Sequence, residues 1–308
     1  MCYHRLAVTL SSAGFPLDLS ADYWALAVLL DPEATDAVAN FLWEAGAAGV
    51  VEEGDGRAVG LRAFFPPGRD PDETSRRLAA FLGELRGLAV PVGPATVEVT
   101  RVPEEAWADA WRAHFRPLRI GRRLLVTPPW ERPDDEGRLV VVIEPGRAFG
   151  TGSHGSTRGC LELLERALAR EPVECVLDVG TGSGILAIAA ARLGAASVTG
   201  LDQDPDAVAA ARANAARNAV ADRVHVALGG CEAWPGSPAP LVVANLLAPA
   251  LVALAPTLGR CCTADGRLIA GGLLSHEASA VTAAFVPQGF ALAEVLEHEG
   301  WAALLLAR

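Results

Sequence analysis

The sequence feature that most constrains the fold is a glycine loop set between an apolar strand and an Ala-rich helix. The strand and loop consist of Val176, Leu177, Asp178, Val179, Gly180, Thr181, Gly182, Ser183 and Gly184, and the helix follows at 185–193. Glycine allows a tight turn and a close approach of the backbone to a ligand, which a Cβ atom would obstruct. A dinucleotide fingerprint would need glycine in place of Ile185, and a P-loop would need lysine. The spacing therefore predicts an α/β ligand-binding loop of another class.

Helices and strands alternate from residue 154 onward, which predicts a doubly wound sheet of seven strands with five or six helices. The expected helices include 154–170, 185–193 and 205–218, and the expected strands are 174–179, 197–201, 223–227, 241–244, 267–270, 291–296 and 301–306. The turn 297–300 is too short for a helical crossover, so the last two strands should pair antiparallel. This pattern favours a methyltransferase over a nicotinamide-binding fold, with S-adenosylmethionine bound at Gly180 and Gly182.

Two polar side chains end strands at the carboxyl edge of the predicted sheet. Asp202 follows the second strand, where a carboxylate can accept both hydroxyls of an adenosine ribose, and Asp204 before Pro205 is the better helix cap. Asn245 ends the fourth strand at the same edge. Its side chain could bind at the site, or it could equally cap the helix that follows.

The part of the chain before this domain has a different pattern. The order β-α-β-β-α-β predicts a small ferredoxin-like α+β domain. Behind it, Trp107, Trp111 and Phe115 are spaced at four on one face of an expected linker helix, as a stripe for domain packing would be. The predicted divisions are an N-terminal extension 1–22, a ferredoxin-like domain 23–102, a linker helix and connecting segment 103–135, and a methyltransferase domain 136–308.

The composition limits which kinds of partner and which cellular compartment are expected. The 26 basic residues are all Arg against 37 acidic residues, a net charge of −11, which argues against direct nucleic-acid binding and could suit a basic protein. Six cysteines without a CxxC pair and six histidines without HExxH predict no metal site. No secretory signal is evident, and prolines interrupt the uncharged stretch 233–259. We expect a cytoplasmic monomer with no membrane segment.

Several longer motifs resemble one known family. They are the segments Glu144-Pro145-Gly146-Arg147-Ala148-Phe149-Gly150-Thr151-Gly152-Ser153-His154, Ser156-Thr157, 177–190 and Val243-Ala244-Asn245-Leu246-Leu247-Ala248, with Trp130 and Glu299-Gly300-Trp301 in support. Over roughly residues 23 to 308, the chain is similar to the PrmA-type methyltransferase of bacterial large-subunit ribosomal protein eleven. Gly155 and Ser156 depart from the residues usual in that family.

The resemblance implies a fold and a site. The fold would be a class I (Rossmann-like) seven-stranded methyltransferase domain preceded by the ferredoxin-like domain, which would recognise a ribosomal protein substrate. S-adenosylmethionine would donate methyl groups to lysine side chains and to an N-terminal α-amine. By match to the family's motifs, the cofactor contacts fall on Thr157, Gly180, Asp202 and Asn245.

Methyl transfer to an amine is an in-line displacement, which needs a positioned neutral amine more than an acid–base pair. Asn245 is the candidate catalytic residue, through an oxygen that orients the amine's lone pair. Phe149 and His154 could line the substrate channel, or could be a buried Phe and a structural His. The alternatives for function are a lysine methyltransferase acting on another protein, a small-molecule methyltransferase, a nicotinamide-dependent oxidoreductase and a binding protein that kept the fold.

Overall fold

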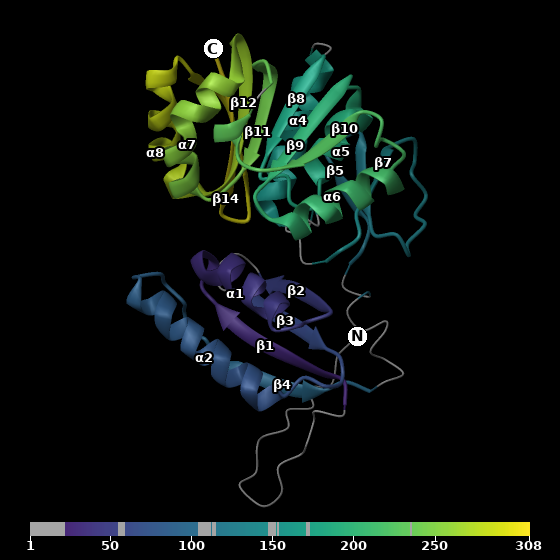
Figure 1. The fold of residues 1–308 in the computed structure, drawn as a ribbon, viewed down its shortest axis with the longest axis vertical. Coiled ribbons are helices and arrows are strands. Elements are labelled where there is room, and N and C mark those ends of the chain that lie inside the picture. Colours follow the sequence, from purple (N-terminus) through teal and green to yellow (C-terminus); the bar gives the residue numbers. More distant parts are fainter. Residues whose placement is uncertain are drawn as a thin grey trace, which may run out of the picture.

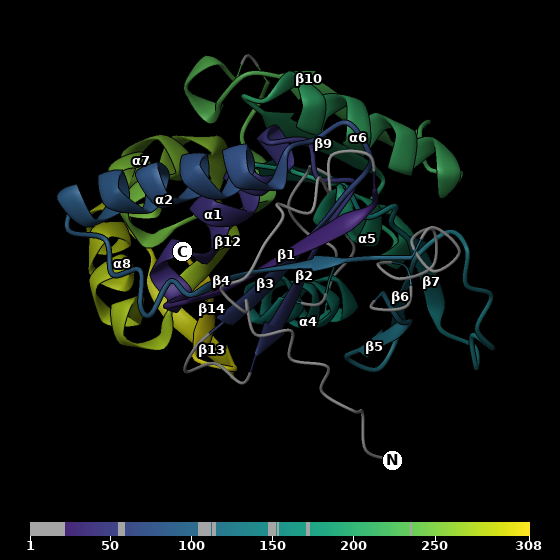
Figure 2. The same cartoon turned by 90° about the horizontal axis from the view of Figure 1, so that it is seen from below.

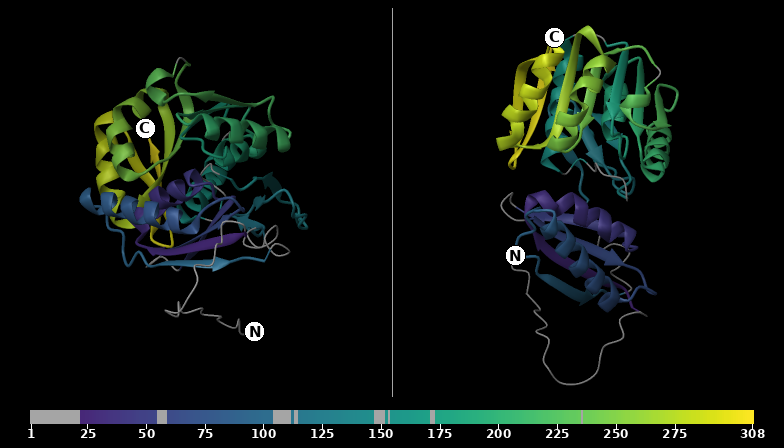
Figure 3. Two further views of the ribbon diagram at one scale, coloured as in Figure 1. Left: turned by 60° about the horizontal axis from the view of Figure 1, so that its bottom comes forward. Right: turned by 60° about the vertical axis from the view of Figure 1, so that its left-hand side comes forward.

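The structure is a computed structural model that describes residues 22–54, 59–103, 112, 115–146, 152, 154–170, 173–234 and 236–308. Its described strands form three sheets, of four, seven and three strands. Figure 1 shows the four-stranded sheet with its helices as the lower body and the seven-stranded sheet as the upper body. Figure 3 shows the same two bodies from two further directions.

The N-terminal unit is a four-stranded antiparallel sheet with two helices. Its elements are β1 (Trp24–Leu30), α1 (Pro32–Glu44), β2 (Gly49–Gly54), β3 (Val59–Phe65), α2 (Pro71–Gly87) and β4 (Val97–Arg101), with strand order β2-β3-β1-β4. Alternate β1 residues point to the helices and are buried with Leu42 of α1 and Leu78 of α2. The largest of these contacts is Trp24 stacked on Phe65, with ring centroids 4.1 Å apart.

Local signals in the sequence set the ends of α2. The Asp70 side chain accepts a hydrogen bond from the Asp72 backbone N–H, and Pro71 occupies the first turn, where its missing N–H costs nothing. Arg86 lies in the last turn, where a cation is favoured. These signals place the start of the helix at Pro71, directly after its cap.

The C-terminal unit is built on the seven-stranded sheet. Its elements are α4 (Gly155–Arg170), β8 (Cys175–Val179), α5 (Ile185–Leu193), β9 (Ser197–Asp202), α6 (Pro205–Arg217), β10 (Val224–Leu228), η3 (Cys231–Ala233), β11 (Ala239–Asn245), α7 (Ala248–Cys261), β12 (Cys262–Leu274), η4 (Ser275–Glu277), α8 (Ala278–Phe285), η5 (Val286–Gln288), β13 (Ala291–His298) and β14 (Trp301–Ala307). The strand order is β10-β9-β8-β11-β12-β14-β13. The first five strands in that order are parallel, and β14 pairs antiparallel with both β12 and β13, so the predicted final hairpin is confirmed.

Helices cover both faces of this sheet. Helices α4, α5 and α6 pack on one face, and α7 and α8 pack on the other. Figure 2, seen from below, shows α7 and α8 apart from α4 and α5. Strand β14 lies inside the sheet, and its residues 301–306 are all buried. No helix among the described residues is long and apolar enough to span a membrane.

A small third sheet was not predicted from the sequence. It consists of β5 (Leu118–Ile120), β6 (Leu124–Thr127) and β7 (Leu139–Val142), with β5 antiparallel and β7 parallel to β6. Ile120, Leu124 and Val126 are buried in the same core as α4 and α5. By packing, these strands belong with the C-terminal unit.

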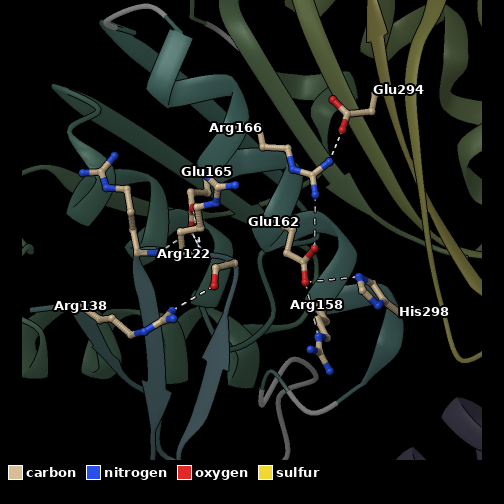
Figure 4. Close-up of polar contacts among 10 residues, drawn as sticks. Arg122, Arg138, Arg158, Glu162, Glu165, Arg166, Glu294 and His298 are labelled. Atoms are coloured by element: carbon tan, nitrogen blue, oxygen red, sulfur yellow. Dashed lines mark hydrogen bonds and ion pairs between the residues drawn. The ribbon is translucent and has the colours of Figure 1, made fainter. Parts of the chain in front are cut away.

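Helix α4 is tied by charged groups on two sides (Figure 4). On one side, the buried Glu165 carboxylate accepts the backbone N–H groups of Arg122 and Arg123, at 3.0 Å each, in the turn between β5 and β6. On the other side, Glu162 lies 3.4 Å from His298 Nε2, and Arg166 pairs with Glu294. The helix is therefore fixed between the small sheet and the β13–β14 hairpin.

Candidate functional site

The predicted site residues lie at the carboxyl edge of the seven-stranded sheet. Strand β8 has β9 on one side and β11 on the other, and all three are parallel. Successive strands of the chain are therefore added first to one side of β8 and then to the other, which makes this a topological switch point. Loops that leave the strands on either side of such a switch point diverge and open a crevice, which is where open α/β sheets bind ligands. The glycine loop leaves β8 at this point.

The glycine loop is held in a left-handed conformation by several backbone contacts. Gly180, Gly182 and Gly184 have φ of +73°, +54° and +82°, a region that residues with a Cβ rarely adopt. The N–H groups of Gly180 and Thr181 both donate to the Leu201 carbonyl, at 2.8 and 2.9 Å. Helix α5 begins directly behind the loop, so its N-terminal N–H groups and dipole face the same edge.

Asp178, on β8, stabilises the loop through a buried hydrogen bond. It is fully buried, and its Oδ2 accepts a hydrogen bond of 2.6 Å from the Thr181 hydroxyl. Burial raises the pKa of Asp178 from 3.8 to about 7, because the charged form loses its hydration. Asp178 is therefore a structural group inside the site rather than a surface ligand.

We expect the Asp178→Asn variant to gain stability relative to the parent as the pH rises from about 4 to about 7. Between about pH 4 and pH 7, Asp178 is protonated in the native parent and ionised in the unfolded chain. The parent's free energy of unfolding therefore falls as the pH rises through this range. Above pH 7 the group is ionised in both states, so its effect no longer changes with pH. Asparagine cannot ionise. Urea unfolding of both proteins across the range measures the difference, and a difference independent of pH would contradict the raised pKa.

Asp202 ends β9 beside the loop and holds it as well. Its Oδ2 accepts the Gly182 N–H at 2.9 Å, and its Oδ1 accepts the Asp204 N–H at 3.0 Å. Each carboxylate oxygen can accept a further hydrogen bond, which leaves capacity for two ribose hydroxyls. Asp204 caps α6 by accepting the Asp206 N–H at 2.8 Å, as the sequence predicts.

Asn245 ends β11 and faces α4 rather than the helix that follows. Its Nδ2 donates to the Thr157 hydroxyl at 3.3 Å, and its Oδ1 is buried without a hydrogen-bond partner among the described residues. The N-cap of α7 is Leu247, with no side-chain cap, so the alternative that Asn245 caps this helix is wrong. A buried, unpaired acceptor costs free energy unless a ligand satisfies it, so Asn245 Oδ1 is a candidate ligand contact.

His154 lies at the entrance to α4, buried at 7% exposure. The Ser156 N–H donates to its Nδ1 at 3.3 Å, which places the proton of the neutral ring on Nε2. Burial lowers the pKa of His154 to about 4, so the ring is neutral near pH 7. The Trp301 ring packs edge-on against the His154 ring, with ring centroids 4.4 Å apart. Glu52 Oε1 of the N-terminal unit lies 4.0 Å from His154 Nε2.

The other predicted channel residue, Phe149, lies outside the described residues.

Gly155 is one of the two departures from the family pattern, and the structure explains why glycine is needed there. A Cβ there would lie 2.6 Å from the His298 carbonyl oxygen, so glycine lets the hairpin tip approach the start of α4. The first turn of α4 also carries Thr157, which is fully buried.

Among the described residues, Asn214 also contacts the loop and was not predicted from the sequence. The Asn214 side chain on α6 donates to the Ser183 carbonyl at 2.9 Å. Its spacing from Asn218, one helical turn later, was a possible signal, because two buried amides on one helix face need polar partners. Within the described ranges, no group of three or more His, Cys, Asp or Glu side chains is arranged to hold a metal ion.

Comparisons with known proteins identify the family to which the chain is similar. The family model described as Ribosomal protein L11 methyltransferase (PrmA) matches residues 22–308. The chain is 39% identical to the ribosomal protein L11 methyltransferase of Symbiobacterium thermophilum over 293 residues, 88% of this chain and 94% of that protein. It is 44% identical to that of Geobacter metallireducens over 247 residues, 80% of each. The crystal structure of ribosomal protein L11 methylase from Lactobacillus delbrueckii subsp. bulgaricus is 31% identical, with a TM-score of 0.58 over 63% of this chain and 99% of that chain.

Proposed function

The chain belongs to the PrmA family of ribosomal protein L11 methyltransferases, and from this premise we propose that it transfers methyl groups from S-adenosylmethionine to lysine and N-terminal amines of ribosomal protein L11. The observation that carries the proposal is the buried Asn245 Oδ1, which lacks a hydrogen-bond partner among the described residues and lies next to Thr157 at the edge where the glycine loop ends. The C-terminal unit has the mixed α/β sheet of a class I methyltransferase.

We propose that the cofactor is held by Thr157, Gly180, Gly182, Asp202 and Asn245. The fit rests on three features of the site: a loop whose glycines have positive φ, a carboxylate with spare acceptor capacity at the end of β9, and the Asn245–Thr157 side-chain pair where β11 ends. A Cβ on Gly180 would lie 2.5 Å from the Leu246 side chain, so glycine lets the loop pack closely against the residue that follows β11. When bound, S-adenosylmethionine supplies an electrophilic methyl group.

The protein's own contribution is to position a neutral amine. A lysine amine has a pKa of about 10.4 in water, so the site must favour its deprotonated form. Removal from water does this, because it disfavours the charged ammonium. Asn245 Oδ1 then accepts a hydrogen bond from the amine and aligns the lone pair with the methyl group. His154 is neutral and already accepts from Ser156 at Nδ1, so we place it as a wall of the amine's path.

The N-terminal unit is proposed to be the ferredoxin-like substrate-recognition domain. Its strand order β2-β3-β1-β4 and its two helices on one face support that assignment. Glu52 on β2 approaches His154, which brings this unit to the site. We further propose a cytoplasmic monomer that does not bind nucleic acid directly, in keeping with its acidic charge.

The direct test is incubation of the full chain with labelled S-adenosylmethionine and purified ribosomal protein L11 from the same organism. We expect label on L11, and mass spectrometry of the product identifies the amines. The chain contains no lysine, so label cannot reside on its own lysines. Calorimetry should show binding of S-adenosylmethionine and not of NAD. Label on another protein but not on L11 would support the alternative of a methyltransferase with a different protein substrate.

We expect a fragment of residues 116–308 to bind S-adenosylmethionine with an affinity within about twofold of the parent, yet to lose methylation of L11. It keeps β5 and β6, whose side chains complete the core under α4, and it lacks the proposed recognition domain. A shorter fragment, 136–308, should unfold at a lower temperature because it uncovers that core. Equal turnover of L11 by the 116–308 fragment and the full chain would refute this division.

A further inference from the structure

One buried amide joins the glycine loop to the segment that follows β7. Asn214 on α6 is 2% exposed. Its Nδ2 donates to the Ser183 carbonyl at 2.9 Å, and its Oδ1 accepts the Glu144 N–H at 3.2 Å. Glu144 lies two residues after the end of β7, so a single side chain bonds both the glycine loop and the segment that leaves β7.

Neighbouring contacts fix this amide. Arg217 Nη1 donates to Asn214 Oδ1 at 2.9 Å, and Arg217 Nη2 pairs with the Glu144 carboxylate. Ala211, one turn before Asn214, lies against the loop so closely that a Cβ on Gly184 would be 3.1 Å from its methyl group. Helix α6 therefore supports the loop along one side, with Asn214 as its polar contact.

We propose that Asn214 is a positioning residue for the cofactor site, a role that rests on the proposed function. Three glycines within five residues leave the loop many conformations, and only one fits the ligand. The Asp202 carboxylate restrains the loop at the Gly182 N–H, and Asn214 restrains it at the next residue, Ser183. When a restraint is lost, the binding-competent fraction falls and the apparent dissociation constant rises in proportion.

The same helix offers a matched control. Asn218 lies one turn after Asn214 and is 1% exposed. Its Oδ1 accepts the Val142 N–H at 2.8 Å, and its Nδ2 donates to the Val142 carbonyl at 2.6 Å. The Asn218 amide thus makes the two hydrogen bonds that the backbone of a neighbouring strand would make with Val142. Replacing either asparagine by alanine removes a buried amide from α6, but the two amides differ in whether they bond the loop.

The experiment compares the full-length parent with Asn214→Ala and Asn218→Ala. The melting temperature without cofactor and the calorimetric Kd for S-adenosylmethionine are measured for each. Both variants should melt at similar, lowered temperatures. The Kd should rise about tenfold for Asn214→Ala and stay within about twofold for Asn218→Ala. Equal Kd values for the two folded variants would overturn the proposal, because a purely structural role affects both alike.

A third variant keeps the test decisive if Asn214→Ala does not fold. Arg217→Ala removes a side chain that is 32% exposed and contacts both Asn214 and Glu144, so the variant should fold and raise the Kd about two- to threefold. An unchanged Kd in Arg217→Ala would then count against the positioning role. If the parent itself does not bind S-adenosylmethionine, the proposed function fails first. If the parent binds and the variants match it, only the role of Asn214 fails.

Discussion

Replacing Asn245 by alanine should lower kcat by about 100-fold, the size of effect that follows when a reacting group loses its orientation. The Asn245 Oδ1 atom is buried and has no partner among the described residues, and it is the acceptor that we assign to the incoming amine. The affinity for the cofactor should change much less. Single-turnover rates at saturating cofactor, measured with the folded fraction known from thermal unfolding, give the comparison.

Thr157→Val is the matched control for this prediction. It removes the 3.3 Å hydrogen bond between the two side chains and leaves Asn245 Oδ1 in place. If orientation of the amine is the main contribution of Asn245, Thr157→Val should affect the Kd for the cofactor more than kcat. A near-normal rate for Asn245→Ala, or the same loss of kcat in both variants, would remove the catalytic role of this oxygen.

Replacing Asp202 by alanine should weaken binding of S-adenosylmethionine by about 1.5–3 kcal/mol, which corresponds to roughly 10- to 150-fold in Kd. Two charge-assisted hydrogen bonds to the ribose would be lost. The structure adds a second reason, because the Gly182 N–H would lose its acceptor and the loop would lose a restraint. Calorimetry at constant salt measures the effect.

Asp204 provides the control, because it carries the same carboxylate two residues later. Its side chain caps α6, so Asp204→Ala should cost about 1 kcal/mol of stability and leave the cofactor's Kd nearly unchanged. Asp202→Asn separates the two contributions of Asp202, since an amide oxygen can still accept the Gly182 N–H. An unchanged Kd in Asp202→Ala would reject the assignment of the ribose.

Much of the fold could be predicted because the sequence signals are local. Helix α5 has the predicted bounds, since Gly184 and Gly194 both adopt the left-handed conformation at its ends. The β5–β6–β7 sheet could not be predicted in this way. Its strands are three or four residues long, which is too short to show a period of two. In addition, β6 and β7 pair in parallel, and a long connecting segment separates them in the sequence.

The candidate site could be predicted where it depends on strand ends. Asp202 and Asn245 follow apolar strands, and parallel strands bring such residues to one edge. The loop contact of Asn214 depends on which face of α6 meets the loop, and sequence spacing alone does not distinguish that face from a solvated one. The second role of Asp202, as an acceptor for the Gly182 N–H, also requires the folded geometry.

The position of β14 has a consequence for synthesis of the chain. Strand β14 comes after both of its partners in the chain, yet it is an interior strand, paired with β12 on one side and β13 on the other. Domains generally fold as units during translation, beginning at the N-terminus. Here the four-stranded unit can form before the rest of the chain is made, but the larger sheet cannot close until β14 has left the ribosome. A nascent chain stalled before residue 301 would leave the edges of β12 and β13 without their partner strand, and unpaired edges promote aggregation.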